Sequence, residues 1–189
     1  MITPEDALKV IKGNSAYTMS YNLIGPEVQL RAKKLCHQYN LSGPDEMEKR
    51  REILRELLGS CTDYTIIQPS FQCDYGFNIH FHGFALLNHN TVILDTSPVH
   101  IGNEVFIAPG VCISCASHPV KAEDRAKGLS VSAPITIEDK VWIGANSTIC
   151  GGVTIGQGSV IAAGSVVISD IPAGVVAAGV PCKVKKTIG

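Results

Sequence analysis

Branched apolar residues recur at every sixth position along the C-terminal two thirds of the chain. The longest unbroken series comprises Ile137, Ile143, Ile149, Ile155, Ile161 and Val167. Two shorter series precede it, formed by Phe81, Leu87 and Ile93 and by Ile101, Ile107 and Ile113. A period of six matches neither a 3.6-residue helix nor a two-residue strand alternation, but it is typical of a parallel β-helix built from hexapeptides. We therefore predict a mainly β protein whose principal domain is a left-handed parallel β-helix.

The residues around the repeated position fit one strand and one corner per hexapeptide. A small residue often follows it, as in Ile143-Gly144 and Ile155-Gly156, and lets the chain turn without a clash. Two positions earlier the side chain is usually Val, Ile or Ser. Three hexapeptides, about 18 residues, close one triangular coil, and stacked coils bury an apolar column that no single repeat could bury alone.

The repeat is interrupted twice. Between Ile93 and Ile101 the step is eight, so two residues are added near Thr96 to Pro98. Between Ile113 and Ile137 the repeat is absent, and the polar segment there predicts a loop that leaves the β-helix at about 114–134. Long loops in compact domains are often functional.

The first 60 residues follow a helical pattern instead. Thr3 with Pro4 and the acidic residues after it indicate a helix start, and Gly13 indicates its end. Two more helices are predicted over 26–39 and 44–58. We expect a helical subdomain at 1–60 packed on a β-helix domain at 61–189, with a basic tail that has left the hexapeptide pattern.

Composition narrows the possible partners. The net charge is −1 and 17% of the 189 residues are charged, so no basic stripe indicates nucleic acid. No apolar run reaches the roughly 18 residues of a membrane span, and the first 13 residues lack the apolar core of a secretory signal. The odd count of seven cysteines then favours reduced thiols in a cytoplasmic protein.

The segment VCISCASHPV at 111–120 contains three residues of types that can bind a metal or carry out redox chemistry: Cys112, Cys115 and His118. A structural zinc site needs four ligands, and a redox Cys pair is expected at a helix N-terminus in a βαβ context; neither setting is found. We predict structural thiols, with Cys112 facing outward. His80 and His82 share one side of a strand, but without a third ligand no metal is predicted.

Several segments resemble the hexapeptide-repeat acetyltransferases, specifically the maltose and galactoside O-acetyltransferase group. The resemblance covers most of the chain, and its most specific parts are SHPV at 117–120, Asn88, Asp95 and VVAAGVPCKV at 175–184. It implies transfer of an acetyl group from acetyl-CoA to a hydroxyl of a small acceptor such as maltose, glucose or a galactoside. It also implies a homotrimer with active sites between subunits.

The resemblance also assigns roles to individual residues. His118 is the general base, which fits the chemistry because a sugar hydroxyl needs a base with a pKa near 7 to become a nucleophile. A backbone N–H near Gly144 and Ala145 is our candidate donor to the oxyanion. The residues implied to bind the acceptor are Asp74, Asn88 and Asp95. Those implied to line the CoA site are Ala145, Ala163, Ser169, Lys183 and Lys186.

One departure from the group leaves the acceptor open. The family usually has a Tyr followed shortly by an acceptor-binding Asp, but the stretch from Ala16 to Asn22 contains no Asp. A non-sugar acceptor such as serine or an antibiotic is therefore an alternative. The serine enzymes have a longer helical N-terminal domain, and the antibiotic enzymes usually lack this helical preface.

Two other functions are possible on the same fold. A metal enzyme like the γ-class carbonic anhydrases needs three histidines around one zinc, and here only His118 occupies a suitable position. A non-catalytic scaffold would not need His118, Asn88 and Asp95 together. The acetyltransferase remains the favoured hypothesis.

Overall fold

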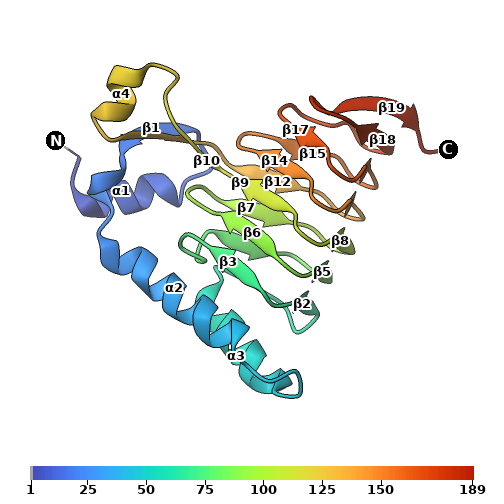
Figure 1. The fold of residues 1–189 in the computed structure, drawn as a ribbon, viewed down its shortest axis with the longest axis horizontal. Coiled ribbons are helices and arrows are strands. Elements are labelled where there is room, and N and C mark those ends of the chain that lie inside the picture. The colour runs from blue at the N-terminus through green and yellow to red at the C-terminus, as the bar shows by residue number, and fades with distance from the viewer. Residues whose placement is uncertain (1) are drawn as a thin grey trace.

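The computed structural model describes residues 2–189 and shows a prism of stacked short strands with helices across one end (Figure 1). Successive strands of each coil lie on three different faces, which we name after the strands of one coil: the β4 face, the β5 face and the β6 face. The strands that stack from coil to coil along each face are parallel, and this confirms the predicted parallel β-helix; only the last strand of the β5 face runs antiparallel.

The β4 face contains β4 (Ile79–Phe81), β7 (Val99–Ile101), β12 (Ile135–Ile137) and β15 (Thr154–Ile155). The β5 face contains β2 (Thr65–Ile67), β5 (Ala85–Leu87), β8 (Val105–Ile107), β13 (Trp142–Ile143), β16 (Val160–Ile161), β18 (Val175–Ala178) and the antiparallel β19 (Lys183–Thr187). The β6 face contains β3 (Phe71–Cys73), β6 (Thr91–Leu94), β9 (Cys112–Ser114), β14 (Thr148–Cys150) and β17 (Val166–Val167).

The six-residue repeat forms the core of the prism. Ile101 pairs with Ile137, which pairs with Ile155, so the repeated residue stacks on its equivalent in the next coil. Every member of the three series exposes 2% or less of its surface. The serines two positions earlier are also buried, and their hydroxyls donate to backbone carbonyls, for example Ser159 to Pro172 at 2.7 Å. Because these hydroxyls keep a partner, their burial costs little.

Glycine is required where adjacent coils touch at a corner. A Cβ on Gly144 would lie 2.5 Å from the backbone nitrogen of Ala163, and one on Gly156 would lie 2.4 Å from that of Ala173. Backbone cannot move aside without breaking the ladder, so a side chain at either position would force the coils apart.

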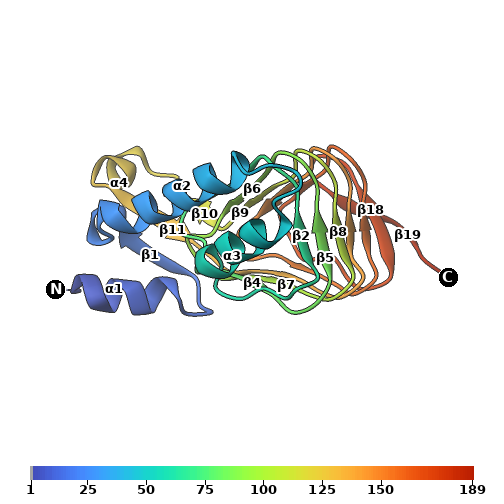
Figure 2. The ribbon, with the colours of Figure 1, turned by 90° about the horizontal axis from the view of Figure 1, so that it is seen from below.

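Three helices precede the coils, as the sequence predicts: α1 (Pro4–Ile11), α2 (Pro26–Asn40) and α3 (Met47–Leu57). The predicted cap is confirmed, since the Thr3 hydroxyl accepts the N–H of Asp6 at 3.1 Å. α2 and α3 lie across the first coil (Figure 2), and the buried side chains Leu35, Tyr39 and Leu57 join the core of the prism. The helices therefore close one end of the apolar column.

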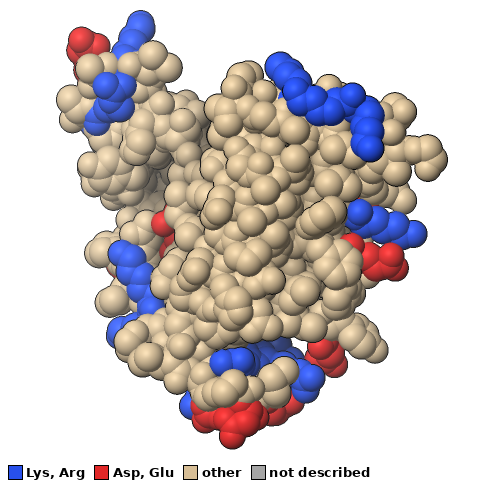
Figure 3. Space-filling view, turned by 45° about the vertical axis from the view of Figure 1, so that its right-hand side comes forward, with Lys and Arg blue, Asp and Glu red and all other residues tan. Residues whose placement is uncertain are grey.

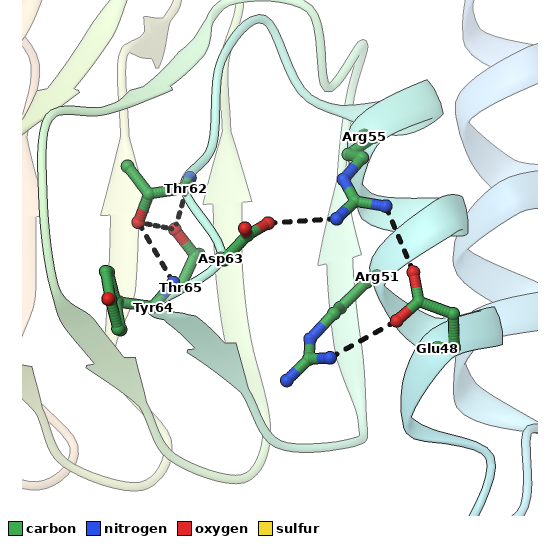
Figure 4. Close-up of polar contacts among 7 residues, drawn as sticks. All are labelled: Glu48, Arg51, Arg55, Thr62, Asp63, Tyr64 and Thr65. Atoms are coloured by element: carbon green, nitrogen blue, oxygen red, sulfur yellow. Dashed lines mark hydrogen bonds and ion pairs between the residues drawn. The ribbon is translucent and has the colours of Figure 1, made fainter.

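Ion pairs link α3 to the strand that follows it. Arg55 contacts Asp63 at 2.9 Å, just before β2, and Glu48 at 3.2 Å on its own helix (Figure 4). Beside them, the Thr65 hydroxyl accepts the backbone N–H of Thr62 at 3.0 Å. The charged side chains are largely exposed, so they contribute little energy and mainly orient the helix.

The segment predicted as a loop has structure of its own. It contains β10 (Ala116–Ser117), α4 (Ala122–Ala126) and β11 (Leu129–Ser132), and β11 pairs antiparallel with both β10 and β1 (Tyr17–Ser20). A 3₁₀ turn, Tyr21–Leu23, follows β1. This small sheet and α4 project beside the prism (Figure 1). The sequence did not predict β1, β11 or their pairing.

The two residues added between Ile93 and Ile101 anchor this small sheet. The Tyr17 hydroxyl donates to the Thr96 carbonyl at 2.6 Å, and the Ser132 hydroxyl lies 2.7 Å from those of Thr96 and Ser97. The eight-residue step is therefore a docking point for β1 and β11.

Among the helices of residues 2–189 the longest is α2, with 15 residues, and none has the length and apolar content to cross a bilayer.

Candidate active site

Three of the predicted site residues lie at one corner of the prism. The chain passes from the β6 face to the β4 face after β3, after β6 and after β9, and these passages carry Asp74, Asp95 and His118. The three residues thus occupy the same corner in three successive coils. We name it the His118 corner.

Asp95 is fully buried beneath this corner. Its Oδ1 accepts the backbone N–H groups of Asp74 at 3.0 Å and Tyr75 at 2.9 Å, and its Oδ2 accepts the N–H of Asn78 at 3.3 Å. None of its surface is exposed. The Asp95 carboxylate therefore faces backbone amides and holds the turn that presents Asp74, so a role in positioning the acceptor would act through this turn.

Burial also changes the acidity of the two carboxyl groups. It raises the pKa of Asp95 to about 6, while the Tyr75 N–H lowers the pKa and the nearby Asp74 raises it. Burial raises the pKa of Asp74 as well, and Lys33 opposes this shift. Both groups are therefore harder to ionise here than in water.

His118 lies just beyond β10, is exposed to solvent and lines a cavity of about 210 Å³. The other side chains that line this cavity are Tyr17, Met19, Tyr21, Ile24, Gln29, Tyr75, Thr96, Ala116, Ser117 and Ser130. No Asp, Glu, Lys or Arg is among them. A second cavity of about 460 Å³ also contacts Tyr21, Ile24, Gln29 and Tyr75, so the two cavities adjoin; together we call them the His118 groove, whose wall is uncharged and partly aromatic.

The stretch that lacks the expected Asp forms part of this wall. Met19 is only 5% exposed and packs in an apolar cluster with Ala7, Ile11 and Tyr75. Sequence reasoning missed the contributions of Tyr17, Tyr21 and Tyr75 to the site. The pairing of β1 with β11 brings Tyr17 and Tyr21 to His118, whereas the turn after β3, held by Asp95, brings Tyr75 there; no local signal in the sequence shows either placement.

Asn88, Ala145 and Ala163 lie at a different corner. They follow β5, β13 and β16, where the chain passes from the β5 face to the β6 face. The structure therefore aligns these three residues along one corner, with the coil of β8 between Asn88 and Ala145, but it does not bring them to His118 within one chain. Asn88 is half-buried, and its Oδ1 accepts the backbone N–H of His89 at 2.8 Å.

Hydrogen bonds between neighbouring coils decide which of the two candidate N–H groups is free to stabilise the oxyanion. The Gly144 N–H donates to the Ile161 carbonyl at 2.8 Å, so it is already used between coils. Gly144 is therefore excluded as the donor, and Ala145 remains the candidate at this corner.

The remaining predicted CoA residues lie toward the C-terminal end. Ser169 is exposed in the turn after β17, at the His118 corner but in a later coil. Lys183 and Lys186 are exposed on β19, opposite Ala178 and Val176 of β18. Their ammonium groups extend from the last strand of the β5 face.

The cysteine pair and the histidine pair each have a different setting in the part of the chain that the structure describes. Cys115 is 1% exposed and Cys112 faces outward from β9, as predicted. His80 and His82 are joined by His100, with ring centroids 5.1 and 5.4 Å from the His100 ring. The rings stack, and within residues 2–189 no group of three or more His, Cys, Asp or Glu side chains is placed to hold a metal ion.

A further groove, of about 450 Å³, lies between α3 and β2. Its lining includes Met47, Arg51, Leu54 and Tyr64, and none of the predicted site residues. The uncharged groove at His118 is therefore the candidate active site.

Comparisons with known proteins agree with this architecture. Residues 134–169 match the bacterial transferase hexapeptide family, and residues 27–62 match the maltose acetyltransferase hexapeptide capping motif. The chain is 45% identical to galactoside O-acetyltransferase of Escherichia coli over 163 residues, which cover 86% of this chain and 80% of that protein. The capping motif coincides with α2 and α3, the helices that close the prism.

Two solved structures share the whole fold. A galactoside acetyltransferase in complex with coenzyme A superposes with a TM-score of 0.88 at 42% identity, covering 97% of this chain and 91% of that one. A maltose O-acetyltransferase from Clostridium difficile gives 0.89 at 38% identity, covering 100% and 98%.

Fold and site together define a hexapeptide-repeat transferase with its N-terminal end capped by helices. The chain belongs to the galactoside and maltose O-acetyltransferase family, which confirms the resemblance seen in the sequence. It is accordingly an acetyltransferase that takes its acetyl group from acetyl-CoA.

Proposed function

We propose that the protein acetylates a hydroxyl of a neutral sugar, with His118 as general base. The observation that supports this most directly is the position of His118 at the mouth of a groove with no charged lining side chain. The names of the related proteins, galactoside and maltose O-acetyltransferases, agree with a sugar acceptor.

The transfer needs no covalent enzyme intermediate. His118 removes the proton of the acceptor hydroxyl as its oxygen attacks the carbonyl carbon of the thioester. The tetrahedral intermediate places a negative charge on the former carbonyl oxygen, which the N–H of Ala145 from a neighbouring copy stabilises. Collapse of the intermediate breaks the carbon–sulfur bond, and the departing CoA thiolate takes the proton from His118.

The groove favours a sugar over a charged acceptor such as serine. The carboxylate and ammonium of an amino acid would lose their hydration without gaining an ionic partner from this wall. A sugar ring instead offers an apolar C–H face to the exposed ring of Tyr21, and hydroxyls to Gln29 and Ser130. Asp95 positions the groove wall indirectly, because its carboxylate fixes the turn that carries Asp74 and Tyr75.

The separation of the two corners supports a site shared between copies of the chain. His118 and Asn88 follow strands of different faces, so a cleft that uses both needs two chains. Residues Ala145, Ala163, Ser169, Lys183 and Lys186 would then hold CoA, with the two lysines at its phosphates. We propose a homotrimer in which the His118 corner of one subunit meets the Asn88 corner of the next.

An apolar stripe on the outside of the β5 face suits this contact. Aligned across neighbouring strands, it consists of Ile66, Leu86, Phe106, Trp142, Val160 and Val176. Phe106 is 45% exposed and Trp142 is 53% exposed. The β4 face instead presents His80, His100 and Thr136 outward. Figure 3 brings the β5 side forward and shows a broad surface with few charges, which is typical of a surface that another chain covers.

Replacing Phe106 with Glu should separate the subunits. A carboxylate in the centre of the stripe would be buried without a partner, so association becomes unfavourable. We expect the solution mass to fall from three chains to one and acetyl transfer to fall with it. Thr136→Glu, on the outside of the β4 face, should leave the mass unchanged. An active wild-type protein with the mass of one chain would contradict the shared site.

The acceptor is tested directly by thiol release from acetyl-CoA. The panel contains maltose, glucose, a galactoside, glucosamine, serine and chloramphenicol, each at several concentrations. We expect neutral sugars to give the highest kcat/KM and serine to give none above background. A preference for serine or chloramphenicol would overturn the sugar assignment and leave the acetyltransferase assignment intact.

A further inference from the structure

Two buried thiols meet where α2 closes the first coil. Cys36 on α2 is 1% exposed, Cys73 at the end of β3 is 8% exposed, and their sulfur atoms lie 3.6 Å apart. Both residues belong to the apolar core, and neither lines the His118 groove. The proposed function makes no use of this pair.

The backbone around the two thiols is held in place by a reciprocal pair of hydrogen bonds. The Asn40 side chain donates to the Phe71 carbonyl at 2.9 Å and accepts the Phe71 N–H at 2.9 Å. Asn40 lies one helical turn after Cys36, and Phe71 lies on the same inward side of β3 as Cys73. The sulfur atoms therefore stay adjacent, and a bond of about 2.0 Å requires only a small approach.

The pair is also chemically unequal. The hydrogen bond with Cys73 lowers the pKa of Cys36, whereas that same pairing and burial raise the pKa of Cys73. Since the thiolate is the reactive form, the lowered pKa favours Cys36 as the sulfur that attacks the oxidant. With so little exposed surface, only a small oxidant such as a peroxide has access.

We propose that Cys36 and Cys73 form an oxidative modification site, which hydrogen peroxide converts to an intramolecular disulfide. The Cys36 sulfur attacks one peroxide oxygen, becomes a sulfenic acid and releases the first water. The Cys73 sulfur then displaces the hydroxyl group from Cys36, forms the S–S bond and releases the second water. The two sulfurs lose two electrons in total, and the peroxide is reduced to two water molecules.

The bond would join the helical cap to the β-helix covalently. It closes a loop from α2 through α3 and β2 to β3, and such a cross-link restricts the unfolded chain more than the folded one. The oxidised protein should therefore be more stable than the reduced protein, with a thermal midpoint higher by about 5 °C or more.

The test uses the full-length protein, treated with hydrogen peroxide and then denatured, alkylated and digested without reductant. We expect wild type to lose two of its seven thiols and to yield one cross-linked peptide pair containing Cys36 and Cys73. The rise in thermal midpoint should disappear after dithiothreitol. Cys112→Ser, which removes a half-exposed thiol of β9, should behave like wild type.

Cys36→Ser and Cys73→Ser should each lose the cross-linked peptide and the peroxide-dependent rise in midpoint. Because the peptide is first identified in wild type, poor folding of either variant does not remove the test. The proposal is overturned if Cys36 and Cys73 are still alkylated after treatment while other cysteines are oxidised. It is also overturned if the disulfide joins a different pair. Acetyl transfer is not the readout, so this result is independent of the acceptor assignment.

Discussion

His118→Ala should lower kcat/KM for the best acceptor by a factor of roughly 10² to 10⁴, the usual contribution of a positioned general base. The imidazole opens on the uncharged groove, and no Asp, Glu or Lys lines that groove to take over the proton. KM for acetyl-CoA should change little, because His118 is proposed to act on the acceptor. Thiol release at varied acceptor and acetyl-CoA concentrations separates these two effects.

His37→Ala provides the matched control, since this histidine is exposed on α2 and does not line the His118 groove. It should retain the wild-type rate. Full activity of His118→Ala with the same acceptor would show that another group removes the proton. A loss of circular dichroism signal in His118→Ala would instead indicate misfolding. The rate would then be measured with His118→Gln, whose side chain has similar polarity.

Asp95→Ala should cause the largest loss of stability among the site residues. It removes the acceptor of the N–H groups of Asp74, Tyr75 and Asn78, and each buried N–H left without a partner costs about 1–3 kcal/mol. We expect unfolding to become easier by about 3 kcal/mol or more, together with a raised KM for the acceptor because the turn that carries Tyr75, which lines the groove, is released. Asp74→Ala, at the half-buried neighbour, should change stability little, because only the backbone N–H of Asp74 takes part in these bonds.

Asp95→Asn separates charge from shape. The pKa of Asp95 is raised to about 6 in the folded protein, above the unfolded value, so the folded state binds its proton more tightly. Its contribution to stability is therefore present at low pH and is lost as the pH rises through about 6. Asn does not titrate, so its contribution does not change with pH. As the pH rises from about 4 to about 7, the free energy of unfolding of wild type should therefore fall relative to that of Asp95→Asn. Denaturant titrations across that range measure it, and a constant difference would contradict the raised pKa.

The β-helix could be predicted from the sequence because its core is periodic and local. Each repeated residue, such as Ile143 or Ile149, is buried for the same reason as its neighbours six residues away, and a single pattern describes them all. The sequence also predicts helices α1 and α2, because their first residues carry local signals such as Thr3 and the prolines at 4 and 26.

The small sheet beside the prism could not be predicted in the same way. The Ser130 hydroxyl bonds the Met19 carbonyl across a separation of 111 residues, and no periodicity connects the two segments. The sequence likewise identified Asp95 as a residue that positions the acceptor or orients the base, but it gave no sign that the carboxylate is buried. A carboxylate is ordinarily exposed, and only the tertiary structure shows that three backbone amides enclose this one.

A stack of parallel rungs has no intrinsic length, because each coil leaves an open strand edge on which another could be added. In this protein α2 and α3 cover the first coil, and β19 folds back antiparallel along β18 at the other end. All of β19 is exposed, and it carries Lys183 and Lys186, the kind of charged edge that discourages further strand addition. The two ends together disfavour end-to-end joining of molecules into fibres, which leaves the sides of the prism for the contacts of the proposed trimer.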